Sequence, residues 1–215
     1  MKDDSTDIHV NKRRSDPLPN PESVGTLIRT RRSIKPGQFD GRRIDDVIVR
    51  EMLENANWAP THGMTEPWRF FVFCDEVLNS LGRKLAEIYR RVTPSGAFKP
   101  AKAEKLLQSA IRSSHVIAFA MKRQESRRIP EIEEIQAVAC AIQNLHLTAT
   151  AYGVGGSWSS GKVICSDQFR DSLGLDVEDR VLGLFYLGFP AVPWPAGERS
   201  PIAEKVQWFR AAEGV

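Results

Sequence analysis

Apolar residues in this chain form both short uninterrupted runs and longer stretches with helical spacing. Three runs, 68–74, 116–121 and 181–188, are short enough to be buried strands. Apolar positions three or four apart predict helices over 22–32, 45–56, 76–91, 101–112, 131–152 and 167–173. Residues 157–158 should begin a short edge strand or loop. Few strands among many helices indicate an α/β or α+β sandwich with helices on both sheet faces.

The stretch 131–152 is the longest periodic segment and is apolar on most sides. Such a helix must be covered nearly all round, so we expect it in the core or at a subunit interface. Gly153 is placed to end it.

The two ends of the chain differ in composition from the middle. Residues 1–21 are polar and charged, so we expect a flexible tail, followed by a single domain over 22–215. The final stretch, about 191–215, carries Trp194, Trp208 and Phe209 among polar residues. These aromatic rings need a surface, and we expect this C-terminal arm to wrap a neighbouring subunit.

Composition narrows the function classes. A net charge of +3 over 215 residues is too balanced to indicate a nucleic-acid partner. No apolar run approaches the roughly 20 residues that span a bilayer, and no signal core opens the chain, so we expect a cytoplasmic protein without a membrane partner.

The three cysteines, Cys74, Cys140 and Cys165, are predicted to be buried free thiols, and no metal-ligand spacing occurs.

Three short motifs carry the candidate chemistry. Arg31-Arg32-Ser33-Ile34-Lys35 places cations and a hydroxyl where a helix ends, which suits a phosphate or equally a helix dipole. The loop 58–68 leads into a buried strand and contains His62. The glycine-rich stretch 153–161 could approach a planar ligand or simply cap a helix, and it lacks the spacing of a nucleotide-binding loop.

Together these motifs resemble the nitroreductase family. The ordered set RTRRSIK, ANWAPTHGMTEPWRFFVF, GVGGSWSSG and GLFYLGFP spans about residues 22–190. The resemblance implies an α+β sandwich with a central, mostly antiparallel sheet. It also implies an FMN-dependent homodimer whose two active sites are each built from both subunits. Such an enzyme takes hydride from NAD(P)H and reduces nitroaromatic, quinone or similar electron-poor acceptors in a ping-pong cycle.

The resemblance also assigns residues, position by position, and it requires no catalytic acid or base from the protein. Arg31, Arg32 and Ser33 match residues that hold FMN, and Lys35 matches a basic residue usual in the family. Trp58 and His62 match positions that reach FMN from the other subunit. Thr148 matches a position associated with the nicotinamide nucleotide. The remaining cofactor-binding positions are Trp158, Ser159 and Ser160.

Three residues depart from the family pattern. Ser159 and Trp58 stand where arginines are usual, and Glu66 replaces a glutamine. We therefore expect a flavin pocket with fewer cations. The departures leave open a relative with a different flavin reaction, such as dehalogenation or flavin cleavage, or a non-catalytic flavin binder. A helical interaction module without a small-molecule site is a third reading.

Overall fold

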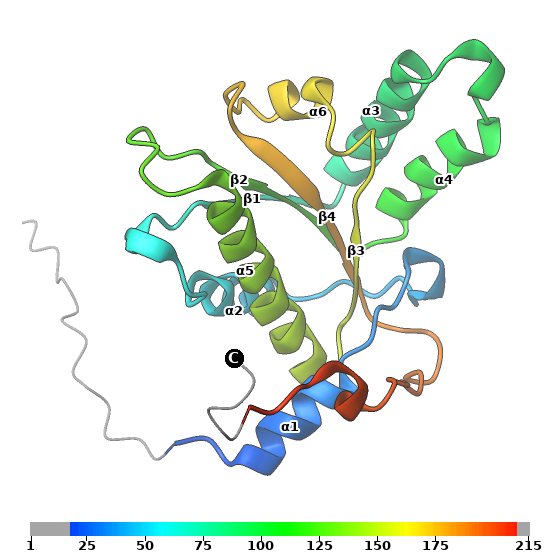
Figure 1. The fold of residues 1–215 in the computed structure, drawn as a ribbon. Helices are drawn as coiled ribbons and strands as arrows, with labels where there is room; N and C mark the ends of the chain where they lie inside the picture. The colour runs from blue at the N-terminus through cyan, green and yellow to red at the C-terminus, as the bar shows by residue number, and fades with distance from the viewer. Residues whose placement is uncertain (1–17, 210–215) are drawn as a thin grey trace, which may run out of the picture.

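The computed structural model describes residues 18–209, so most of the predicted N-terminal tail and the last six residues lie outside the described part. Within it the chain alternates helices with four strands (Figure 1). The strands are β1 (Trp68–Cys74), β2 (His115–Met121), β3 (Gly155–Ser159) and β4 (Arg180–Gly188). The α-helices are α1 (Pro21–Thr30), α2 (Asp46–Asn57), α3 (Val77–Val92), α4 (Pro100–Ile111), α5 (Glu131–Ala151) and α6 (Asp167–Ser172).

The four strands form one sheet in the order β1-β2-β4-β3, with every neighbouring pair antiparallel. β2 and β4 are central and read as continuous apolar runs because both of their faces are covered. β3 is an edge strand and also the shortest strand, with Trp158 and Ser159 near its exposed end. The expected antiparallel α+β sandwich is therefore confirmed.

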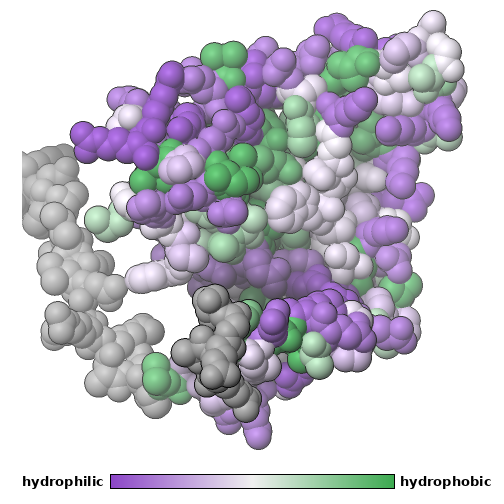
Figure 2. Space-filling view, viewed as in Figure 1, coloured by the Kyte–Doolittle hydropathy of each residue, from purple (hydrophilic) through white to green (hydrophobic). Residues whose placement is uncertain are grey.

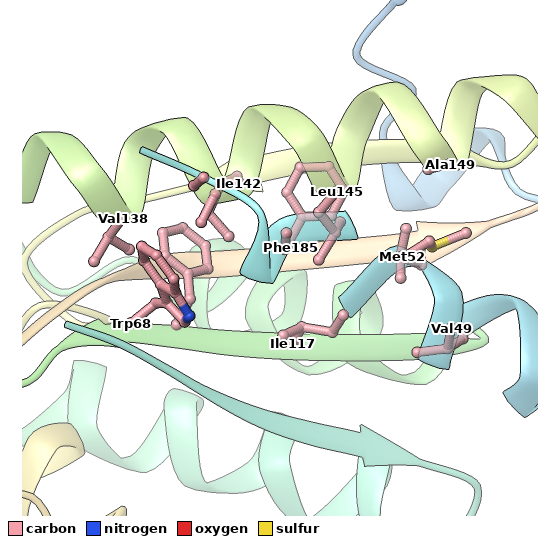
Figure 3. Packing of buried hydrophobic residues seen from close by; sticks show 14 of the residues in the cluster. Val49, Met52, Trp68, Ile117, Val138, Ile142, Leu145, Ala149 and Phe185 are labelled. Atoms are coloured by element: carbon pink, nitrogen blue, oxygen red, sulfur yellow. The ribbon is translucent and has the colours of Figure 1, made fainter. Parts of the chain in front are cut away.

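Two hydrophobic clusters lie on opposite faces of the sheet. On one face α5 and α2 pack against side chains such as Ile117 and Phe185, as Figure 3 shows for the labelled residues. On the other face α3, α4 and α6 cover Val116, Leu184 and Tyr186. Each fully buried large apolar side chain contributes about 1.5–3 kcal/mol, so both layers are needed for the fold.

Helix boundaries follow the local sequence signals. Asn20 caps α1 and Asp45 caps α2, each through a side-chain oxygen that accepts a backbone N–H. α5 ends where Gly153 takes a φ of +66°, a conformation that glycine adopts without strain. α1 ends at Thr30, slightly before the predicted residue 32, so Arg31 and Arg32 lie just outside the helix.

One expectation about the surface needs correction. Cys140 and Cys165 are exposed and Cys74 is half-buried, so the three thiols are not the buried group that their apolar contexts predicted. The wrapping of a neighbouring subunit by the C-terminal arm stays a prediction, but Trp194 already has a partner in its own chain. Its indole N–H donates to the carbonyl of Thr30 at 2.6 Å, which fastens the arm beside α1 (Figure 1).

Hydrophilic side chains cover most of the face seen in Figure 2, and hydrophobic ones appear as small separate patches. Across residues 18–209, no helix has the length and apolar character needed to cross a membrane.

Candidate functional site

A cleft of about 430 Å³ lies between α4 and the β3 edge of the sheet. It brings together five of the ten predicted cofactor-binding residues: Ser33, Lys35, Trp158, Ser159 and Ser160. The rest of its lining is Pro36, Lys102, Lys105, Leu106, Ser109, Ser157, Gly161, Lys162, Val163, Ile164 and Tyr186. Two motifs separated by more than a hundred residues thus form walls of one cleft.

Backbone contact brings these two motifs together. Ser33 forms an isolated parallel bridge with Gly156, and the Ile34 amide donates to the Gly156 carbonyl at 3.0 Å. A Cβ on Gly155 would lie 2.8 Å from the Cβ of Ile34. The glycine run therefore lets the first motif approach β3 closely enough to share the cleft.

The Trp158 ring is held from several sides. It packs edge-on against Phe119, with ring centroids 4.9 Å apart, and its indole N–H donates to the Leu182 carbonyl at 3.2 Å. A Cβ on Gly183 would lie 2.3 Å from the indole nitrogen, so the absence of a side chain there makes room for the ring. Trp158 still keeps 43% of its surface exposed, and its ring lies on the α5 face of the sheet with Phe119, opposite to the face of its strand neighbour Ser157.

Arg31 and Arg32 do not line the cleft. Together with Arg199 they form a cluster of arginines, and in the sequence they directly precede Ser33 of the cleft. Burial, followed by the nearby charges of Arg199 and Arg32, lowers the pKa of the Arg31 guanidinium. The Arg32 guanidinium donates to the carbonyls of Arg29 and Arg31, while its Nε is buried and has no hydrogen-bond partner. Within residues 18–209 none of Arg31, Arg32 and Arg199 forms an ion pair with a carboxylate. Such a cluster suits a phosphate.

His146 lies beneath this cluster. Its Nε2 donates to the Arg32 carbonyl at 3.0 Å, and its ring packs edge-on against Phe185. Burial, and secondarily the charge of Arg31, lowers its pKa to about 4. The imidazole is therefore neutral at pH 7 and adds no charge beneath the arginines.

The other three predicted residues lie away from the cleft in this chain. Trp58 ends α2 with 71% of its surface exposed. His62 opens a short 3-10 turn and its Nδ1 lies 2.6 Å from Glu133. Thr148 donates to the Asn144 carbonyl and accepts from Asn55. One chain alone does not bring these three residues to the cleft.

Sequence reasoning missed five residues: Lys102, Lys105, Lys162, Tyr186 and Arg199. The two α4 lysines look like an ordinary solvated helix face, and Tyr186 looks like one more core residue of a buried strand. With four lysines and no carboxylate in its lining, the cleft is rich in cations, contrary to the expectation drawn from Ser159 and Trp58. Only the tertiary structure, which places α4 and the β3 edge on one cleft, reveals this charge.

A serine, a histidine and an aspartate also meet where β2 begins. The Ser114 hydroxyl donates to His115 Nδ1 at 2.9 Å, and His115 Nε2 lies 3.2 Å from Asp46. None of the three lines the cleft, and Ser114 also accepts the Ile44 amide, so the arrangement ties β2 to the start of α2. No group of His, Cys, Asp and Glu side chains in the described residues could hold a metal ion.

Comparisons with known proteins show the family of the chain. The sequence model of the nitroreductase family matches residues 28–189. The Bacillus subtilis protein named "Putative NAD(P)H nitroreductase YfhC" is 29% identical over 183 residues, covering 83% of this chain and 90% of that protein. The Escherichia coli protein named "Putative NAD(P)H nitroreductase YdjA" is 30% identical over 146 residues, covering 66% and 75%.

Solved structures agree on the fold. A nitroreductase-like family protein from Bacillus cereus has a TM-score of 0.76 at 24% identity, over 91% of this chain and all of the other. A nitroreductase from Desulfovibrio desulfuricans, crystallised with FMN, has a TM-score of 0.65 at 25% identity, over 90% and 99%.

Proposed function

The chain belongs to the nitroreductase family of oxidoreductases, and from this we propose that it binds FMN, takes hydride from NADH or NADPH and reduces nitroaromatic, quinone or similar electron-poor acceptors. The observation that carries the proposal is the meeting of Ser33 and Lys35 with Trp158, Ser159 and Ser160 in one cleft. An FMN-bound relative supports the same cofactor. Bound FMN would supply the two-electron chemistry between nucleotide and acceptor.

The arginine cluster fits the phosphate of FMN. Its guanidiniums lack carboxylate partners in the described part of the chain. The Nε–H of Arg32 has no hydrogen-bond acceptor there and could donate to a phosphate oxygen. Arg31, Arg32 and Arg199 would hold the phosphate through charge-assisted hydrogen bonds. Lys35 and the segment Trp158 to Ser160 would then orient the ring, and the Lys35 ammonium would stabilise negative charge that develops in the cleft.

The remaining assigned residues support a homodimer. Trp58 and Met64 are 71% and 85% exposed on the loop that the family resemblance places at a second subunit. Large exposed apolar side chains on one loop suit an interface with a second copy. Trp58 and His62 would then reach the site of the other subunit, while Thr148 would contribute to nucleotide binding.

The phosphate assignment can be tested by comparing FMN with riboflavin, which lacks the phosphate. Arg199→Gln should weaken FMN binding by about tenfold or more, because a charge-assisted hydrogen bond is worth about 1.5–3 kcal/mol. Riboflavin binding should be unchanged. Flavin fluorescence titration measures both affinities, and Arg83→Gln on α3 is the matched control, since that arginine bonds only Asn79. Equal FMN affinity in wild type and Arg199→Gln would contradict the assignment.

A further inference from the structure

Two hydroxyl groups lie unpaired at the base of the cleft. Ser157 on β3 and Tyr186 on β4 are direct cross-strand partners, so both side chains point to the same face of the sheet. They are 9% and 3% exposed, and neither hydroxyl makes a hydrogen bond within residues 18–209. Among the described residues only Arg32 Nε is both fully buried and without a partner, so the two hydroxyl oxygens are reachable from the cleft. Both hydroxyls line the cleft, so a ligand there could satisfy them.

Lysines line the same cleft as these hydroxyls. Lys102 and Lys105 stand three residues apart on α4, and Lys162 follows β3. Lys102 lies over the Tyr89 ring at 4.9 Å, but no lysine of the cleft forms an ion pair among the described residues. Lys105 also lines an adjoining hollow with Arg112. Clustered cations without carboxylates attract an anion.

This cluster is separate from the arginines. The proposed function already matches the single phosphate of FMN with Arg31, Arg32 and Arg199, none of which lines the cleft. The lysines and hydroxyls on the α4 side are therefore left for a second ligand. Burial raises the pKa of the Tyr186 phenol, which consequently stays protonated and acts as a hydrogen-bond donor.

We propose that the α4 side of the cleft is an anion-binding subsite, and that the electron acceptor is an aromatic compound carrying a carboxylate, held by Lys105, Tyr186 and Ser157. The inference rests on the proposed function, since it assigns the second ligand of the same site. The hydroxyls of Ser157 and Tyr186 and the ammonium of Lys105 line one cleft. Together they match a planar carboxylate, which accepts several hydrogen bonds at once. Acceptor choice is then set by charge as well as by shape.

The test compares two acceptors of nearly equal shape, 4-nitrobenzoate and the neutral 4-nitrobenzamide. Calorimetry on the full-length protein with FMN added should give about tenfold tighter binding of the benzoate, in line with one charge-assisted hydrogen bond. Lys105→Gln and Tyr186→Phe should each reduce this preference severalfold. Lys84→Gln, an exposed α3 lysine away from the cleft, is the matched control and should keep it.

Tyr186→Phe also separates binding from folding. The substitution keeps the buried ring and removes only an unpaired hydroxyl, so its urea midpoint should equal or exceed that of the wild type. Equal affinity of the wild type for both compounds would overturn the proposal, as would a preference that persists in both variants. If Lys105→Gln weakened FMN but not riboflavin, the lysine would serve the cofactor phosphate and the proposal would be wrong.

The two proposals fail in different ways. If the protein bound no flavin, the proposed function would fall, while calorimetry of 4-nitrobenzoate against the same full chain would still show whether the anion subsite exists. If flavin were bound and reduced but the benzoate had no advantage, only the acceptor assignment would fall.

Discussion

At the scale of single residues, the site depends on where side chains are absent as much as on where they are present. Gly183 leaves room for the Trp158 ring, Gly156 leaves room for the Phe185 ring, and Gly155 lets the segment of Ser33 and Ile34 approach β3. The neutral His146 supports the backbone carbonyl of Arg32 from below. Small local packing choices therefore fix the walls of the cleft.

Gly183→Ala should displace the Trp158 ring, because a Cβ there would lie 2.3 Å from the indole nitrogen and 2.5 Å from Phe119. We expect a loss of about 1–3 kcal/mol in the free energy of unfolding, as for other overpacked sites. FMN affinity should fall with it. Urea denaturation and flavin titration measure the two effects, and unchanged values for both would refute the assigned packing.

His146 should make stability depend on pH. Its folded pKa of about 4 is below the ordinary value of 6.5, so the unfolded chain binds the proton more tightly. The free energy of unfolding should therefore fall as pH drops from about 6.5 to about 4, by on the order of 3 kcal/mol in total. Above pH 6.5 the residue should have no effect, because it is then neutral in both states.

His146→Gln provides the comparison, since glutamine can still donate to the Arg32 carbonyl but does not titrate. Subtracting the two profiles of unfolding free energy against pH removes the contribution of carboxylates, which titrate in the same pH range, and leaves that of His146. Parallel profiles from pH 7 to pH 4 would be inconsistent with a buried neutral imidazole.

At the scale of elements, sequence patterns predicted most of the framework. The three apolar runs became β1, β2 and β4 with bounds shifted by at most one residue, because continuous burial on both faces leaves a clear pattern. β3 was only half predicted, since its five residues are rich in glycine and serine and lack that pattern. The sequence did not predict the cationic character of the cleft, because the tertiary position of α4 brings Lys102 and Lys105 to it.

The first turn of α5 is held by a buried ion pair. Glu134 has no exposed side-chain surface, pairs with Arg123 and accepts the Gln124 amide. Glu134→Ala should lower the free energy of unfolding by about 3–5 kcal/mol, since it leaves the arginine buried and unpaired. Urea denaturation measures this. The exposed pair of Arg127 and Glu178 is the control, where Glu178→Ala should change stability by at most about 1 kcal/mol.

At the scale of the whole molecule, one chain leaves part of the proposed site unassembled. The cleft gathers residues from the first motif, α4, β3 and β4, whereas Trp58, His62 and Thr148 lie elsewhere in the same chain. The family resemblance predicted all ten positions, yet a single chain unites only five of them in the cleft. The resemblance had already assigned Trp58 and His62 to the other subunit, and their distance from the cleft within one chain agrees with that assignment.

Trp58→Glu should weaken both self-association and FMN binding, because it places a charge on an exposed apolar side chain of the proposed interface. Sedimentation equilibrium should give a dimer for the wild type and a larger monomer fraction for the variant. Val177→Glu, at an equally exposed apolar residue away from that loop, is the control and should remain dimeric. A monomeric wild type that retains full FMN affinity would contradict the shared site.

The most direct test of the central claim is anaerobic stopped-flow mixing of the FMN-loaded protein with NADH and, separately, with NADPH. We predict rapid bleaching of the visible flavin absorption band with at least one nucleotide, and its return when 4-nitrobenzoate is added. A protein that binds no FMN, or whose flavin band persists with both nucleotides, would contradict it.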